Sequence, residues 1–290
     1  MVKYLELIQE ARESGSRENW LRAIALYEEA FEIAIDIDDY LDYGLAHLQI
    51  GDKVRAEDII QNALLENEDN PNCYYIYGMF YEETNQIDKA IQMLEKANEL
   101  ILSADYLFDL ARLYDEVDKE KAIITYQKAL KLDPNHYWAN LNLGCLYEEM
   151  QENETALIYL LQAKNIDENG PMLNYNLGVV YAKVKQYDKA IECYQKAIDD
   201  SSDLACFNIA ILYKDYYKDY KMSKYYYLEA IKRNKNDYRF WYNLGCLYAI
   251  IEDYSNAIEC LKYAAYLEPK VTRYISQDPE LQALKNKCLD

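Results

Sequence analysis

A small residue recurs along the chain about every 34 residues, and this repeat restricts the fold more than any other feature. The residues concerned are Gly44, Gly78, Ala111, Gly144, Gly178, Ala210 and Gly245. Successive spacings are 34, 33, 33, 34, 32 and 35 residues. Three residues after each small residue stands a ring side chain, first His47 and then a tyrosine in every later cycle. A period kept over so many cycles predicts an array of similar structural units.

Two further rows of small residues, seven positions apart, mark the second half of each unit. The first row is Ala23, Ala56, Ala90, Ala122, Ala156, Ala190, Ser223 and Ala257. The second row is Ala30, Ala63, Ala97, Ala129, Ala163, Ala197, Ala230 and Ala264. The apolar residues between them follow helical spacing. Because two helices approach closely only where side chains are small, each unit is predicted to be a hairpin of two helices.

Residues 241–269 show the pattern most completely, as Trp241-x2-Leu244-Gly245-x2-Tyr248 followed by Ala257, Ala264 and Pro269. This pattern resembles the tetratricopeptide repeat, with Leu261 in place of the usual aromatic residue. The resemblance implies an all-α fold, a right-handed α-solenoid of about eight helical hairpins plus a C-terminal capping helix. The predicted single solenoid over residues 1–290 has repeats at about 3–36, 37–70, 71–103, 104–136, 137–170, 171–202, 203–237 and 238–270, and a cap at 271–290.

Several local departures from the repeat also carry predictions. The first repeat lacks the Gly-x2-Tyr signature, and the seventh has one extra residue in its tyrosine-rich loop at 216–220. Gly15, Gly51 and Gly170 do not belong to the repeating row, and we predict that they lie in turns. In the cap, Asp278 followed by Pro279 is typical of the start of a short helix.

Composition excludes several classes of function. A net charge of −20 disfavours sequence-independent binding to nucleic acid or to anionic lipid. There is no uncharged apolar run of about 18 residues, so no membrane-spanning helix is predicted. Seven widely spaced cysteines and two histidines give no zinc-binding pattern. We therefore predict no metal and no cofactor, and a reducing, cytoplasmic location in which most cysteines are buried.

The chain is predicted not to be an enzyme. His47 and His136 are 89 residues apart and occupy unrelated positions of the repeat, so a catalytic pair is disfavoured. His47 takes the place of a tyrosine and is predicted to be a packed core residue. The glycine-rich loops that bind nucleotide phosphates are absent from the sequence.

The resemblance implies that positions 2, 5, 6, 9, 12 and 13 of each repeat line a concave face, when the small residue of the first helix is counted as position 8. In the C-terminal half, position 6 is Asn142, Asn176, Asn208 and Asn243. An amide offers a donor and an acceptor, so such a row can pair with a peptide backbone. It is similar to the asparagine ladder of O-linked N-acetylglucosamine transferase. The alternative is that asparagine is simply common at this position.

Apolar and aromatic side chains flank the asparagines. Position 5 supplies Leu141, Tyr175, Phe207 and Tyr242, and position 9 supplies Val179 and Ile211 between Cys145 and Cys246. Together with the asparagines they form the predicted peptide-binding set, although aromatic residues at position 5 also serve in packing.

The N-terminal half instead presents an acidic strip. It consists of Glu82, Glu83, Asp109, Asp115, Glu116, Glu148 and Glu149, with Asp42 nearby at position 6. An acidic strip attracts a cationic segment and speeds its docking. The alternative is a solvated face in a chain that carries 51 acidic residues.

These features predict an adaptor or scaffold that binds an extended peptide of another protein, with a basic segment as the favoured partner. A clamp for the C-terminal carboxylate of heat-shock chaperones is disfavoured, because Tyr75 and Met79 stand where that clamp needs lysine and asparagine. The alternatives are a peptide-sensing regulatory protein and a non-catalytic subunit that presents substrates to an enzyme.

Overall fold

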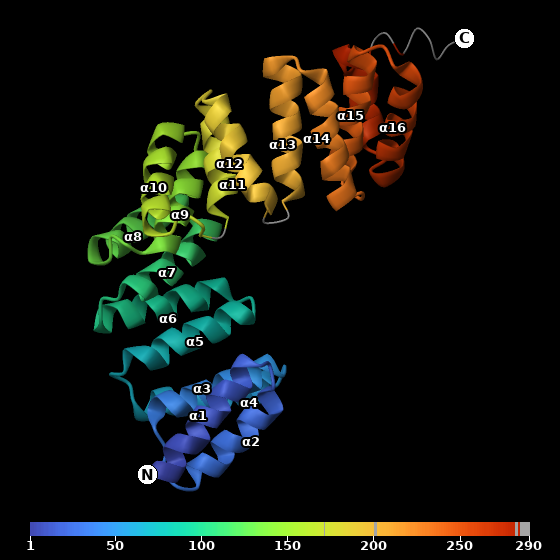
Figure 1. Cartoon of the computed structure of the whole chain (residues 1–290). Coiled ribbons are helices and arrows are strands. Elements are labelled where there is room, and N and C mark those ends of the chain that lie inside the picture. The colour runs from blue at the N-terminus through green and yellow to red at the C-terminus, as the bar shows by residue number, and fades with distance from the viewer. Residues whose placement is uncertain (171, 200–201, 282–283, 285–290) are drawn as a thin grey trace. The chain divides into compact units, whose positions relative to one another are not determined.

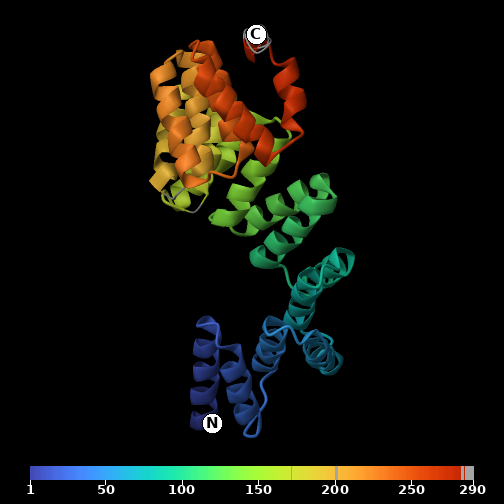
Figure 2. The ribbon, with the colours of Figure 1, turned by 90° about the vertical axis from the view of Figure 1, so that its right-hand side faces the viewer.

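The computed structural model describes residues 1–170, 172–199, 202–281 and 284. Within these ranges the chain forms helices and no strand, so the all-α prediction is confirmed (Figures 1 and 2). The chain divides into two compact units, residues 1–146 and residues 147–290. That the whole chain is a single solenoid therefore stays a prediction.

Unit 1 contains four helical hairpins and most of α9. Its helices are α1 (Val2–Ser16), α2 (Trp20–Phe31), α3 (Ile37–Gln49), α4 (Lys53–Glu66), α5 (Pro71–Glu83), α6 (Ile87–Leu100), α7 (Ala104–Val117) and α8 (Lys119–Leu132). The boundary between the units falls within α9 (Tyr137–Glu149). Inside each of these hairpins the two helices pack together, and α2, α4 and α6 also pack on the first helix of the next hairpin (Figure 1).

Unit 2 continues the same alternation after the end of α9. Its helices are α10 (Asn153–Ile166), α11 (Leu173–Lys183), α12 (Tyr187–Asp199), α13 (Asp203–Leu212), α14 (Tyr220–Arg233), α15 (Tyr238–Ile250), α16 (Tyr254–Leu267) and α17 (Val271–Gln277). Two short elements complete it, the π-helical turn η1 (Tyr213–Tyr217) and the 3-10 turn η2 (Pro279–Leu281). No helix in the described ranges combines the length and the apolar character needed to cross a bilayer.

Aspartates begin many of the second helices. The side chains of Asp52, Asp118, Asp219 and Asp253 accept hydrogen bonds from backbone N–H groups in the first turns of α4, α8, α14 and α16. A carboxylate there satisfies a free donor and interacts favourably with the helix dipole. Part of the negative charge of the chain therefore serves helix capping.

The turn between the two helices of a hairpin has a recurring backbone conformation. Glu18, Gly51, Asn85, Gln151, Lys185, Lys218 and Glu252 all have φ between 56° and 84°. Gly51 lies in a turn as predicted. The fourth hairpin has no such residue, since Asp118 both ends α7 and caps α8.

The predicted close approach of the two helices is confirmed at the glycines. A Cβ atom added at Gly178 would lie 2.5 Å from a ring carbon of Tyr194, and one at Gly245 would lie 2.8 Å from Leu261. The prediction that Gly15 lies in a turn is wrong. It belongs to the last turn of α1, where a Cβ atom would lie 2.8 Å from the ring of Trp20.

The irregular segments of the structure lie where the sequence departs from the repeat pattern. The extra residue of the seventh repeat is absorbed by η1, because a π-helical turn takes up one residue more than an α-helical turn. In place of the single capping helix that was predicted, the described part of the cap contains two short elements, α17 and η2, and η2 begins at Pro279 as expected. Residues 282–283 and 285–290 lie outside the described residues. The hydroxyl group of Tyr242 donates to Asp278, which attaches the cap to α15.

Candidate peptide-binding site

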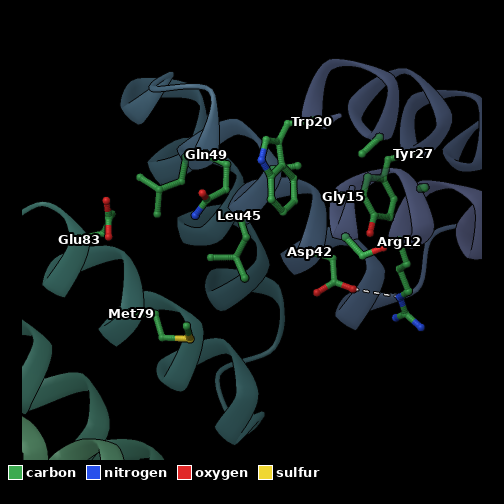
Figure 3. Close-up of a pocket in the computed structure, with 14 residues that line it drawn as sticks. Arg12, Gly15, Trp20, Tyr27, Asp42, Leu45, Gln49, Met79 and Glu83 are labelled. Carbon is green, nitrogen blue, oxygen red and sulfur yellow. Dashed lines mark hydrogen bonds and ion pairs between the residues drawn. The ribbon is translucent and has the colours of Figure 1, made fainter. Parts of the chain in front are cut away.

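A cavity of about 310 Å³ opens in unit 1 between the first helices of three consecutive hairpins, α1, α3 and α5, beside α2 (Figure 3). Two rows of equivalent positions form much of its wall. Position 9 contributes Arg12, Leu45 and Met79, and position 13 contributes Ser16, Gln49 and Glu83. The family resemblance assigns both rows to the concave face, so the cavity coincides with part of the expected groove.

One end of the cavity is polar and carries an excess of negative charge. Arg12 donates from Nε to Asp42 Oδ2 at 3.1 Å and from Nη2 to Asp39 Oδ1 at 2.8 Å. A single guanidinium thus serves two carboxylates. Burial raises the pKa of Asp42 although Arg12 opposes this. Burial also raises the pKa of the neighbouring Tyr27 to about 12.

The middle of the cavity is apolar. Leu45 and Trp20 lie between the Arg12–Asp42 pair at one end and Met79 and Glu83 at the other (Figure 3). The Trp20 ring can lie over α1 because Gly15 has no side chain. Met79 is 39% exposed, and its flexible thioether can adapt to different partner side chains.

The four asparagines of the predicted ladder are not equivalent. Asn142 Nδ2 donates to the Tyr126 hydroxyl at 3.4 Å. Asn208 Nδ2 donates to the hydroxyl groups of Tyr194 at 3.2 Å and Tyr175 at 3.4 Å, and Asn243 Nδ2 donates to a backbone oxygen at 2.9 Å. Asn176 Nδ2 is buried and has no acceptor among the described residues. Peptide binding by this row therefore stays a prediction.

The residues that flank the ladder divide into two groups. Leu141 is 1% exposed and belongs to the core, so its place in the predicted peptide-binding set is wrong. Phe207 contacts Phe240, with ring centroids 5.0 Å apart, and Tyr175 and Tyr242 bond through their hydroxyl groups to Asn208 and Asp278. Val179 and Ile211 are half-buried. For these five residues, contact with a peptide stays a prediction.

Basic side chains that the repeat pattern does not indicate partly neutralise the acidic strip. Arg112 pairs with both carboxylate oxygens of Glu82, and its Nη2 lies 3.7 Å from Asp109 Oδ1. Lys183 pairs with Glu148. Burial raises the pKa of Asp109.

The remaining members of the strip differ in exposure. Asp115 is half-buried, and Glu149 is exposed. Glu83 and Glu116 are also exposed, and neither forms an ion pair with any residue that the structure describes.

Four residues of the cavity, Arg12, Leu45, Gln49 and Met79, were not among the predicted site residues. The signal was present in the sequence, since Ala11 precedes Gly44 by 33 residues and is fully buried. Ala11 is therefore the small residue of the first repeat, and Arg12 occupies position 9. Without the Gly-x2-Tyr signature, that register was not assigned.

The fold and the cavity define a class of protein, a repeat protein of helical hairpins with its candidate site on the first helices. No cluster of metal-ligating side chains occurs in the ranges that the structure covers. Family models for the tetratricopeptide repeat match residues 104–136, 125–158, 173–199 and 226–259. A model for subunit 3 of the anaphase-promoting complex (cyclosome) matches residues 16–97. The chain is a tetratricopeptide repeat protein.

The chain is similar to a known protein in sequence and to solved structures in fold. The chain is 24% identical over 259 residues to the TPR repeat-containing protein MJ1428 of Methanocaldococcus jannaschii, a match covering 87% of this chain but only 39% of that protein. A chain of the APC/C hetero-tetramer Cut9–Hcn1 gives a TM-score of 0.61 at 18% identity, covering 98% of this chain and 55% of the other.

A second solved structure is pilF of Pseudomonas aeruginosa. It gives a TM-score of 0.60 at 18% identity and covers 69% of this chain and 92% of the other. At these identities both structures support the α-solenoid fold alone.

Proposed function

We propose that the chain is a non-catalytic adaptor that binds an extended, basic segment of another protein along the first helices of its hairpins. The observation that carries this proposal is the cavity of unit 1, where three consecutive hairpins combine the half-buried Trp20 and Leu45 and the exposed Met79 with excess negative charge. A volume of about 310 Å³ suits the insertion of one or two side chains of a partner rather than a folded domain.

The charges around the cavity favour a cationic partner. Arg12 is shared by Asp39 and Asp42 at one end, and Glu83 is exposed at the other. A lysine or arginine of the bound segment would complement this excess charge, while an apolar side chain covers Leu45 and Met79. An acidic segment would meet repulsion at both ends.

The comparisons support an assembly role without naming a partner. The model of an anaphase-promoting-complex subunit covers residues 16–97, which include α3 and α5 of the cavity wall. Cut9 was solved in a hetero-tetramer with Hcn1. A cytoplasmic location and the absence of a clamp for heat-shock chaperones belong to the same proposal.

The test is capture of a partner that depends on the cavity. The full chain and its Met79→Lys variant are used to purify binding proteins from the native extract, with Ile124→Lys as the matched control. Ile124 is 53% exposed on α8 and does not line the cavity. We expect a partner that Met79→Lys loses and Ile124→Lys keeps, and that binds through a basic segment when cut into overlapping peptides.

Two outcomes would contradict the proposal. The first is a set of partners captured equally by the chain and by Met79→Lys. The second is a cavity-dependent partner whose binding peptide is acidic.

A further inference from the structure

An aromatic surface in unit 2, on a part of the molecule that the cavity does not use, is formed by two exposed tyrosines and a half-buried one. The rings of Tyr187 and Tyr216 have centroids 4.0 Å apart, and Tyr217 lies edge-on to Tyr216 at 5.0 Å. Tyr216 is 57% exposed and Tyr217 is 38% exposed. The hydroxyl group of Tyr217 donates to Asp188, which holds its ring in place. We call Tyr187, Tyr216 and Tyr217 the tyrosine shelf.

The shelf depends on the one-residue insertion of the seventh repeat. The insertion is taken up in η1, and Lys218 then adopts the left-handed turn conformation found in most of the other hairpins. The hairpin turn is thus preserved, while Tyr216 is brought against Tyr187 at the start of α12. A π-helical turn is rare and occurs frequently at functional sites.

The shelf borders a cleft of about 270 Å³ that is rich in hydrogen-bond donors. Lys185, Gln186 and Lys189 complete its wall. Lys189 donates to Gln186 Oε1 at 2.8 Å, which leaves the amide nitrogen of Gln186 as a donor without an acceptor in the described structure. Asp188, the carboxylate of the wall, already accepts from Tyr217.

We propose that this cleft binds a proline-rich segment of a partner, in the polyproline II conformation, with an acidic residue beside it. Proline has no backbone N–H, and a polyproline II helix has no internal hydrogen bonds, so such a segment presents carbonyl acceptors. Lys185, Gln186 and the Tyr216 hydroxyl supply donors. Proline rings pack well on exposed aromatic faces, and two lysines in a chain of net charge −20 give an acidic flank a specific place to dock.

The test uses the full chain and a display library of peptides with a Pro-x-x-Pro core and random flanks. A second library carries alanine in place of both prolines. The matched pair of variants is Tyr216→Ala and Tyr225→Ala, because Tyr225 is 55% exposed and does not line the cleft. We expect the chain and Tyr225→Ala to enrich proline-core peptides with acidic flanks. Tyr216→Ala should weaken the enriched peptide about tenfold, the loss that fits one stacked ring.

A charge variant provides a second readout that does not depend on the ring. Lys185→Glu should weaken peptides with acidic flanks and spare the same core with neutral flanks. Circular dichroism of each variant checks that the helices are retained. The proposal is overturned by equal enrichment with Tyr216→Ala, by no preference for the proline core, or by displacement of the peptide by a single-stranded oligonucleotide.

Discussion

The hydroxyl group of Tyr75 donates a hydrogen bond to Oδ2 of Asp109 at 2.8 Å, and this bond joins the first helices of two consecutive hairpins. Tyr75 occupies position 5 of its repeat and Asp109 occupies position 6 of the next. The same pair of positions meets again where Asn208 donates to Tyr175. These polar contacts fix neighbouring hairpins along the same rows that were predicted to bind a peptide.

The first prediction is that Asn208 contributes more to the stability of the fold than Asn176 does. Asn208→Ala removes the partner of the Tyr194 hydroxyl, whose side chain is 2% exposed, and of the Tyr175 hydroxyl. We expect the free energy of unfolding to fall by about 1–3 kcal/mol, because a buried polar group is left unpaired. Asn176→Ala removes an amide nitrogen that has no acceptor and should change stability little. Urea denaturation of both variants measures the difference.

An equal loss of stability in the two variants would contradict this distinction. It would also restore the view, taken from the sequence, that the four asparagines form one uniform row. Because both residues are half-buried, exposure alone cannot produce a difference between them.

The hairpins could be predicted from the sequence because their determinants are local and repeated. Gly178 and Ala197 mark close helix contacts, and they recur with a fixed period that needs no knowledge of the fold. Ion pairs cannot be predicted from the repeat in the same way. Arg112 pairs with Glu82, which lies 30 residues earlier in the chain, and no periodic pattern indicates which of several acidic residues a given arginine will bind.

The cavity of unit 1 likewise depends on side-chain contacts that do not recur with the repeat. Gly15 was expected in a turn, yet it lies within α1 and makes room for Trp20. Leu141 shares position 5 with Tyr175, but only the structure shows that the leucine is buried. A repeat pattern assigns a position to a face of the helix, whereas the neighbouring side chains decide how far that position is covered.

The second prediction concerns the alanines of the second helices. Ala163 and Ala197 are 0% and 2% exposed, so replacing either with leucine should overfill the contact between helices. We expect a loss of about 1–3 kcal/mol in the free energy of unfolding. Ala25→Leu, at an exposed position of α2, is the control. Thermal melts that leave Ala163→Leu and Ala197→Leu as stable as Ala25→Leu would show that the assigned register is wrong.

The third prediction is a loss of stability in alkaline solution. Burial raises the pKa of Tyr126 from 10.0 to about 12, and this side chain is fully buried. As pH rises above 10, the unfolded chain loses this proton while the folded chain keeps it, so the unfolded state is favoured. Stability should therefore fall between about pH 10, the unfolded pKa, and about pH 12, the folded pKa. Tyr126→Phe should make the fall shallower in urea titrations, and an unchanged slope would exclude Tyr126 as a contributor.

The last prediction is that some carboxylates of the acidic strip bind a basic partner, whereas Glu82 stabilises the fold. Glu83 and Glu116 are exposed and unpaired within the described chain, so their reversal to lysine should weaken a basic partner and flatten the salt dependence of its affinity. Glu82 accepts both branches of the Arg112 guanidinium, so Glu82→Gln should lower stability by about 1 kcal/mol.

Titration of the captured partner at low and physiological salt, together with urea denaturation, measures both effects. If Glu82→Gln abolished salt-dependent binding while the Glu83 and Glu116 reversals left it intact, the paired carboxylate would be the docking element. The roles of the paired and the unpaired carboxylates would then be the reverse of those predicted.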